Sequence, residues 1–148
     1  MAKRVAEVAA LLHHKGQVLV LTRLQEGEVI HRLPVGRVRR EMRSEDCVAR
    51  LILDSFGFIA EGVNGAIKLT TNHEQLERTN VFHAEMEHVR TEIFMIEMRY
   101  PVFPLGSSDY LIAWKTAQEV HDCYRKIKDA NDYERGVIKL LDALIKSA

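Results

Sequence analysis

The stretch that decides the fold runs from residue 36 to residue 58 and reads GRVRREMRSEDCVARLILDSFGF. Its apolar residues recur every three or four positions, the spacing of one helical face: Val48, Leu51, Ile52 and Phe56. Ser44 is a good N-cap for such a helix, and Gly57 is a typical residue at its carboxyl end. The stretch therefore predicts an amphipathic helix over residues 44–56.

Apolar runs on both sides of this helix predict strands. Residues 5–12 and 18–24 flank a Lys15-Gly16 turn and predict a β-hairpin, and residues 29–33 predict a strand that ends at Pro34. The later elements are predicted from the same kinds of pattern: strands over residues 65–71, 81–87, 91–100 and 110–114, a polar loop or short helix over 72–80, and helices over 116–128 and 132–146. This order predicts an α+β fold rather than regular βαβ alternation.

Length and composition predict one soluble domain spanning residues 1–148. Lys plus Arg and Asp plus Glu both number 21, so no overall field favours nucleic acid or a membrane surface. Two isolated cysteines, Cys47 and Cys123, form no disulfide framework, which favours a reducing compartment. No signal peptide or apolar run of membrane-spanning length is present, so we expect a cytoplasmic protein.

The layout resembles a Nudix domain. A hairpin is followed by Leu33-Pro34-Val35-Gly36, then a helix ending in Gly57-Phe58, and later a strand running into Trp114 just before a helix. Five positions of the Nudix box agree at fixed separations: Gly36, Arg50, Ile52, Gly57 and Phe58. The resemblance covers the whole chain in layout, but the specific matches are confined to the box and its flanks. It implies an α/β/α sandwich with a mixed central sheet.

The acidic positions of the box depart from the family pattern. Met42 stands at the first Glu position and Leu51 at the Glu after Arg50, while Asp54 and Ser55 replace the Glu pair. Positions 51, 54 and 55 share one helix face, where the family's glutamates hold a divalent metal beside a diphosphate. Magnesium prefers hard oxygen ligands, usually carboxylates together with phosphate oxygens and water, so a face with Asp54 as its single carboxylate is a poor metal site. The resemblance thus implies a box in which Asp54 is the one metal ligand left, with Arg50 as its ion-pair partner.

Other residues offer alternative sites. A group of arginines lies before and on the helix: Arg37, Arg39, Arg40, Arg43 and Arg50. Their planar guanidinium groups could bind phosphate oxygens; the alternative is that they belong to a solvated loop. On a strand, His83, Glu85 and Glu87 share a face and could bind a transition metal; the alternative is the polar face of an exposed strand.

Two functions follow from these patterns. The first is a module that binds a nucleotide or another phosphate ligand, or a protein partner, without a cofactor and without standard magnesium-dependent hydrolysis. The alternative is an active hydrolase of a nucleoside diphosphate derivative, using Mg²⁺ or Mn²⁺ with displaced acids: Glu41, Asp54, Glu85, Glu87 and Glu92. Residues 72–80 and 101–109 are the expected selectivity loops. The wide apolar face of the last helix suits either the core or a homodimer interface.

Overall fold

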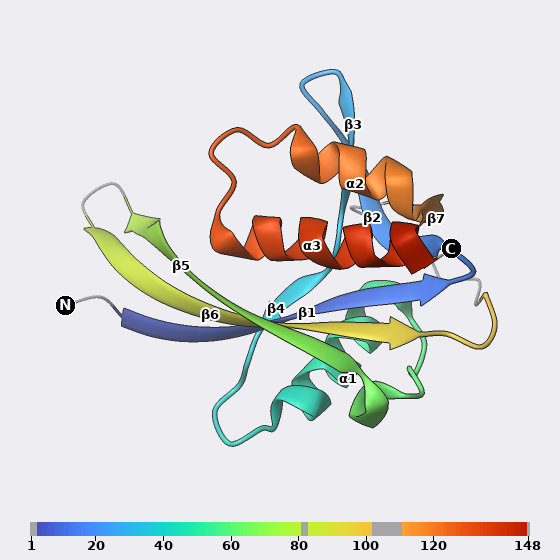
Figure 1. Ribbon diagram of the computed structural model, residues 1–148. Helices are drawn as coiled ribbons and strands as arrows, with labels where there is room; N and C mark the ends of the chain where they lie inside the picture. Colours follow the sequence, from blue (N-terminus) through green and yellow to red (C-terminus); the bar gives the residue numbers. More distant parts are fainter. Residues whose placement is uncertain (1–2, 81–82, 102–110, 148) are drawn as a thin grey trace.

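A mixed seven-stranded sheet forms the centre of the computed structural model, which describes residues 3–80, 83–101 and 111–147 (Figure 1). Its strands are β1 (Lys3–His14), β2 (Gln17–Gln25), β3 (Glu28–Arg32), β4 (Val35–Arg37), β5 (Ile67–Asn80), β6 (His83–Glu97) and β7 (Leu111–Thr116). The helices in these residues are α1 (Ser44–Phe56), α2 (Ala117–Arg125) and α3 (Asp132–Ser147), with a 3₁₀ turn at Val63–Gly65. None of these helices is long and apolar enough to cross a lipid bilayer.

The sheet divides where β1 and β2 separate. The main strand order is β3-β2-β1-β6-β5, with β1 and β6 parallel. The β1–β2 register is confined to the hairpin turn, after which β3 pairs with β2 and β4 pairs with β1. Pro34 lies at this crossing, and its carbonyl oxygen accepts a hydrogen bond from the Ala10 N–H at 3.3 Å. The chain from β3 to β4 therefore lies between the two halves of the sheet.

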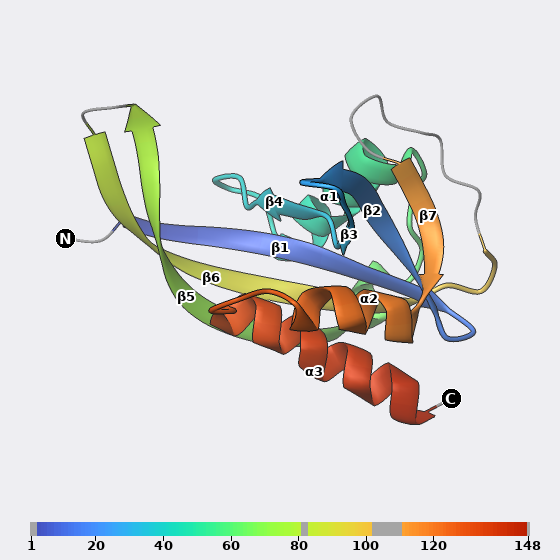
Figure 2. The ribbon, with the colours of Figure 1, turned by 90° about the horizontal axis from the view of Figure 1, so that it is seen from above.

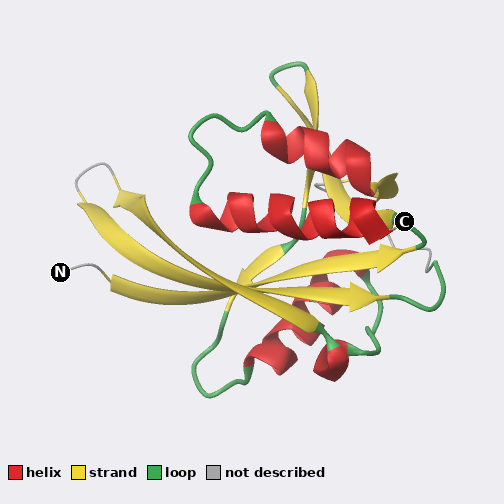
Figure 3. Cartoon of the chain, in the orientation of Figure 1, coloured by secondary structure: helices red, strands yellow, loops and turns green. Residues whose placement is uncertain are grey.

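Helices cover both faces of the sheet (Figures 2 and 3). Alternate residues of a strand point to opposite faces, and β1 is buried on both sides. Val8, Ala10 and Leu12 share one core cluster with α1, whereas Ala9 and Leu11 share the other with α2 and α3. This arrangement is the predicted α/β/α sandwich.

Helix α1 follows its predicted bounds, with one correction at its start. Arg43 is the N-cap and makes no side-chain capping bond, so Ser44 is the first helical residue rather than the cap. The Ser44 hydroxyl donates instead to Glu92 on β6 at 3.1 Å. Gly57 ends the helix in the left-handed region, with φ 81°, and its N–H donates to the Leu53 carbonyl.

The polar segment 72–80 is a strand, not a loop or short helix. It continues β5 and pairs with β6, and the two strands predicted within residues 81–100 are joined in β6; residues 81–82 lie outside the described part. Polar side chains on both faces conceal the alternation that marks a half-buried strand. The β5–β6 hairpin and the start of β1 extend beyond the helices (Figure 1).

The two last helices pack on the sheet. Helix α2 is shorter than predicted, but Thr116 and Glu119 form a capping box at its start. The apolar face of α3 lies in the core, which is the first of the two alternatives given for that face, the other being a homodimer interface. Gly136 allows close approach, because a Cβ atom there would lie 2.7 Å from the Thr71 methyl carbon.

Candidate functional site

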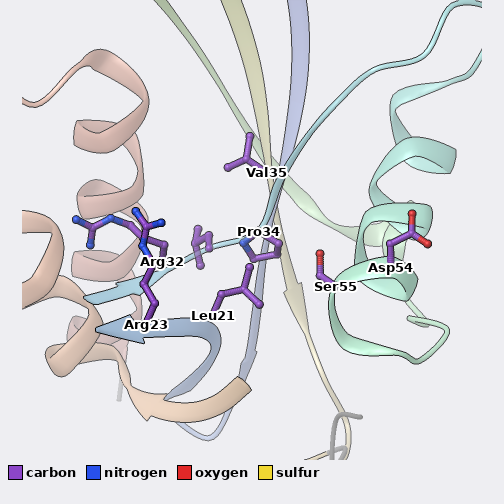
Figure 4. Close-up of a pocket in the computed structure, with 8 residues that line it drawn as sticks. Leu21, Arg23, Arg32, Pro34, Val35, Asp54 and Ser55 are labelled. Atoms are coloured by element: carbon purple, nitrogen blue, oxygen red, sulfur yellow. The ribbon is translucent and has the colours of Figure 1, made fainter. Parts of the chain in front are cut away.

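A cleft of about 400 Å³ opens between α1 and the β2–β3 hairpin (Figure 4). Arg23 and Arg32 form one wall, and Asp54 and Ser55 of α1 form the opposite wall. The apolar floor between them consists of Leu21, Leu33, Pro34 and Val35. The cleft therefore places cationic groups opposite a hydroxyl and a carboxylate.

The register of β2 and β3 brings the two arginines together. Leu21 pairs with Arg32, and Arg23 follows Leu21 by two residues on the same face of β2. Arg23 donates to the Gln25 side chain at 2.8 Å, and Arg32 lies 4.9 Å from the centre of the Tyr124 ring. Neither guanidinium has a carboxylate partner within the described residues. This wall of the cleft is therefore positively charged.

Position 51 places an apolar side chain against the backbone of the box glycine. A Cβ atom added to Gly36 would lie 3.1 Å from Leu51 Cδ1, so the leucine lies directly on this backbone. Arg50 pairs with Asp54, which lies one turn further along α1: Arg50 Nε donates to Asp54 Oδ1 at 3.2 Å, the pair expected from the sequence. Both side chains are well exposed, so the pair stabilises the fold by only ~0.3–0.5 kcal/mol. Helix α1 thus lines the cleft with an ion-paired Asp54 and with Ser55, while Leu51 packs beside them on the Gly36 backbone.

Solved structures superpose on nearly the whole chain. The dihydroneopterin triphosphate pyrophosphohydrolase of E. coli matches with a TM-score of 0.63 at 10% identity, over 100% of this chain and 99% of that one. A MutT NUDIX hydrolase from Burkholderia pseudomallei matches with a TM-score of 0.61 at 16% identity, over 93% and 97%. The MutT protein of Methanosarcina mazei Go1 matches with a TM-score of 0.59 at 16% identity, over 98% and 97%. This chain has the Nudix fold.

The likeness lies in architecture rather than in sequence. No family sequence model matches the chain, and no curated protein sequence matches it significantly. The predicted Nudix-like fold class is nevertheless confirmed, with α1 on one face of the mixed sheet and α2 and α3 on the other.

The divalent metal that a Nudix box implies does not fit the residues of this cleft. Leu51 and Ser55 offer no carboxylate, and Asp54 is engaged by Arg50. Within residues 3–80, 83–101 and 111–147, no group of three or more His, Cys, Asp or Glu side chains is arranged to hold a metal ion. Magnesium prefers several hard oxygen ligands, which this donor set does not supply.

Arg37 lies on the sheet face opposite α1. Gly36 faces Leu51, and the next residue of a strand points the other way. The Arg37 guanidinium pairs there with Glu87 at 2.8 Å and with Glu77 at 3.1 Å. The Glu87 side chain is almost fully buried, and Gln75 also donates to it at 3.0 Å. Arg37 and Glu87 are therefore engaged away from the cleft.

The remaining candidate residues are scattered. Glu92 lies on the α1 side and accepts from Ser44, while Glu85 and Glu41 are exposed, the latter in a loop with φ 69°. Arg39 and Arg40 are exposed in the same loop and do not line the cleft. The side chain of His83 and residues 102–110 lie outside the described part. Of the predicted box residues, Asp54 and Ser55 line the cleft, and Arg50 pairs with Asp54. Arg23 and Arg32 were not predicted, because only the pairing of β2 with β3 brings them to the cleft.

Glu87→Gln is expected to weaken the dependence of stability on acid pH. The interactions of Glu87 with Glu77, Gln75 and Arg37 lower its pKa to about 2 from 4.5. A lowered folded-state pKa stabilises the fold above the unfolded-state pKa, and this stabilisation is lost as the pH falls from about 4.5 to about 2. Urea unfolding should show a less stable variant at pH 7, with the difference from wild type narrowing over that window. Glu85→Gln, at an exposed site on the same strand, should leave the difference constant. Parallel profiles for wild type and Glu87→Gln would contradict the expectation.

Proposed function

We propose that this Nudix-fold chain binds a small phosphate-bearing ligand, such as a nucleotide, in the cleft between α1 and β2–β3. We further propose that it does so without a cofactor and without the standard magnesium-dependent hydrolysis. The observation that carries the proposal is the pair Arg23 and Arg32, whose guanidinium groups form one wall without a carboxylate partner in the described chain.

The chemistry of these side chains supports an anionic ligand. A guanidinium group presents a planar set of donors that matches phosphate oxygens, and it stays charged at all physiological pH values. Ser55 on the opposite wall can donate a hydroxyl hydrogen bond, and the apolar floor suits the organic part of a ligand. The cleft volume falls within the usual range of small-molecule sites, ~300–1,000 Å³.

The residues at the box positions support binding rather than hydrolysis. Met42, Leu51 and Ser55 stand where the box carries glutamates, and Leu51 contacts the Gly36 backbone. Two arginines could neutralise phosphate charge in the role that metal ions have in a complete box. A cofactor-free binding site is consistent with this set of side chains.

A metal-dependent hydrolase is the alternative. The matching E. coli and B. pseudomallei proteins are described as a pyrophosphohydrolase and a hydrolase, which favours it by analogy. Its remaining acids beside α1 are Glu41, Asp54 and Glu92, since Glu87 is engaged by Arg37 on the other face.

Substituting the cleft arginines is expected to reduce ligand affinity. A panel of nucleoside diphosphates and their derivatives would be titrated by calorimetry in EDTA, with wild type and the Arg23→Gln/Arg32→Gln variant. Each hydrogen bond to a charged group contributes about 1.5–3 kcal/mol, and the variant removes one or more from each of two arginines, so the affinity should fall by about 100-fold or more. Arg99→Gln removes an exposed arginine that does not line the cleft and should leave the affinity unchanged.

A turnover assay separates the two functions. Each panel member would be incubated with Mg²⁺ and with Mn²⁺, and release of phosphate or nucleotide would be followed. Turnover that disappears in Asp54→Ala would overturn the binding-only proposal. Binding in EDTA with no turnover would support it, and no binding by any member would leave the cleft without the proposed role.

A further inference from the structure

Four exposed arginines near the start of β1 have no carboxylate partner among the described residues: Arg4, Arg39, Arg40 and Arg90. Other arginines of the protein are ion-paired, as Arg43 is with Asp46 and Arg135 with Asp132. Unpaired guanidinium groups gathered on one side of a sheet are available to an external anion. We call these four residues the arginine surface.

Strand pairing places these side chains together. Arg4 pairs with His88 and Ala6 pairs with Arg90 along the parallel β1–β6 register. Even-numbered residues of both strands face α1, as Val8 and Phe94 do in the core, so Arg4 and Arg90 share that face. The N–H of Val38 donates to the Ala6 carbonyl at 2.9 Å, which holds the loop carrying Arg39 and Arg40 beside the Ala6–Arg90 pair.

Exposed apolar side chains lie next to the arginine surface. Leu76 and Met86 are cross-strand partners on β5 and β6, with 53% and 43% of their surface exposed. Both are even-numbered residues of the hairpin, so they lie on the same face as Arg90. The end of the hairpin bends toward the side of β1 where α1 and the β4–α1 loop lie (Figure 2). This face therefore combines unpaired cations with an uncovered apolar pair.

We propose that the arginine surface, with Leu76 and Met86, binds single-stranded nucleic acid. The guanidinium groups would contact phosphates, and the apolar pair would contact bases that are accessible only in an unpaired strand. The acids on or near this face are Glu41, Glu74 and Glu92; Glu74 lies 3.8 Å from His88 Nδ1, and Glu92 accepts a hydrogen bond from Ser44 of α1. The whole chain has zero net charge, so no overall field draws the nucleic acid to the protein. The attraction comes from the four arginines alone, and salt limits it to short range. None of these residues lines the α1 cleft, so this site is separate from the proposed ligand site.

Fluorescence anisotropy with labelled single-stranded RNA and DNA and with a duplex of the same sequence tests the proposal. Four phosphate contacts predict a log–log salt slope near −3 for a single strand, so affinity should fall by about 50-fold between about 50 and 200 mM salt. Arg4→Gln/Arg90→Gln should lower the affinity by roughly 10- to 100-fold at low salt and reduce the magnitude of the slope by about 1.4. Leu76→Ser/Met86→Ser should weaken single-strand binding without changing the slope.

The matched control removes two arginines elsewhere. Arg99→Gln/Arg125→Gln changes the net charge equally at exposed positions away from this face and should bind like wild type. Three outcomes would overturn the proposal: no single-strand binding at low salt, equal binding of the duplex or of a polyglutamate chain, or an equal loss in the control variant. Arg23→Gln/Arg32→Gln should retain nucleic-acid binding, so failure of the cleft proposal is distinguishable from failure of this one.

Discussion

A variant with glutamate at the four box positions where this chain differs from the Nudix pattern is expected to bind Mn²⁺ and to hydrolyse nucleoside diphosphate derivatives. Its substitutions are Met42→Glu, Leu51→Glu, Asp54→Glu and Ser55→Glu. Positions 54 and 55 lie one turn after position 51 on the same side of α1. Position 51 contacts the backbone of Gly36, and positions 54 and 55 line the cleft opposite its arginines. Three carboxylates there would provide the hard oxygen ligands that wild type lacks.

The expected gain is large because a bound metal acts on the reacting phosphate directly. A metal ion stabilises transition-state charge by several kcal/mol, and each 1.36 kcal/mol changes a rate tenfold, so turnover should rise roughly 100-fold or more. Mn²⁺ binding would be measured by calorimetry and turnover by release of phosphate or nucleotide. Activity should vanish in EDTA and return when metal is added.

The control adds an acid outside the site. Leu53 is exposed on α1 between the box positions, and Leu53→Glu should create neither metal binding nor turnover. Circular dichroism and urea unfolding would establish that each variant is folded. A folded four-glutamate variant that binds no Mn²⁺ would show that the box alignment on this chain is wrong.

Phe56→Ala is expected to lower the free energy of unfolding by ~3–5 kcal/mol, the range for truncating a buried phenylalanine. Phe56 is completely buried where the last turn of α1 meets the sheet, and its ring stacks on Phe58 with centroids 6.2 Å apart. The truncated side chain would leave a cavity beside Ile52, because a packed core relaxes only in part. Urea unfolding at neutral pH would measure the loss.

Leu53→Ala is the matched control on the same helix. Leu53 is 40% exposed and belongs to neither core cluster, so its truncation should cost far less than that of Phe56. Because the last turn of α1 carries Asp54 and Ser55, ligand affinity at the cleft should also fall in Phe56→Ala. Equal losses in the two variants would contradict the packing of α1 described above.

Local patterns predicted the elements that are amphipathic by themselves. Helix α1 and its glycine end follow from the spacing of Val48, Ile52 and Phe56, and the β1–β2 hairpin follows from two apolar runs around a Lys-Gly turn. The same spacing identified the Nudix layout, since Gly36 and Gly57 stand at fixed positions around the helix. The continuation of β5 through residues 72–80 was missed, because a polar strand is specified by its partner β6 rather than by its own pattern.

The sequence by itself determined the helix of the box, the layout of the fold and the residue types at the box positions. Those features depend on residues near each other in the chain, whose spacing sets periodicity and capping. Only the tertiary structure decided which charged side chains meet. Strand register and alternation placed Arg37 with Glu87 on one face of the sheet and gathered Arg23 and Arg32 at the cleft. Pairing between strands distant in sequence fixes these positions, and a register shift of one residue would reverse every face.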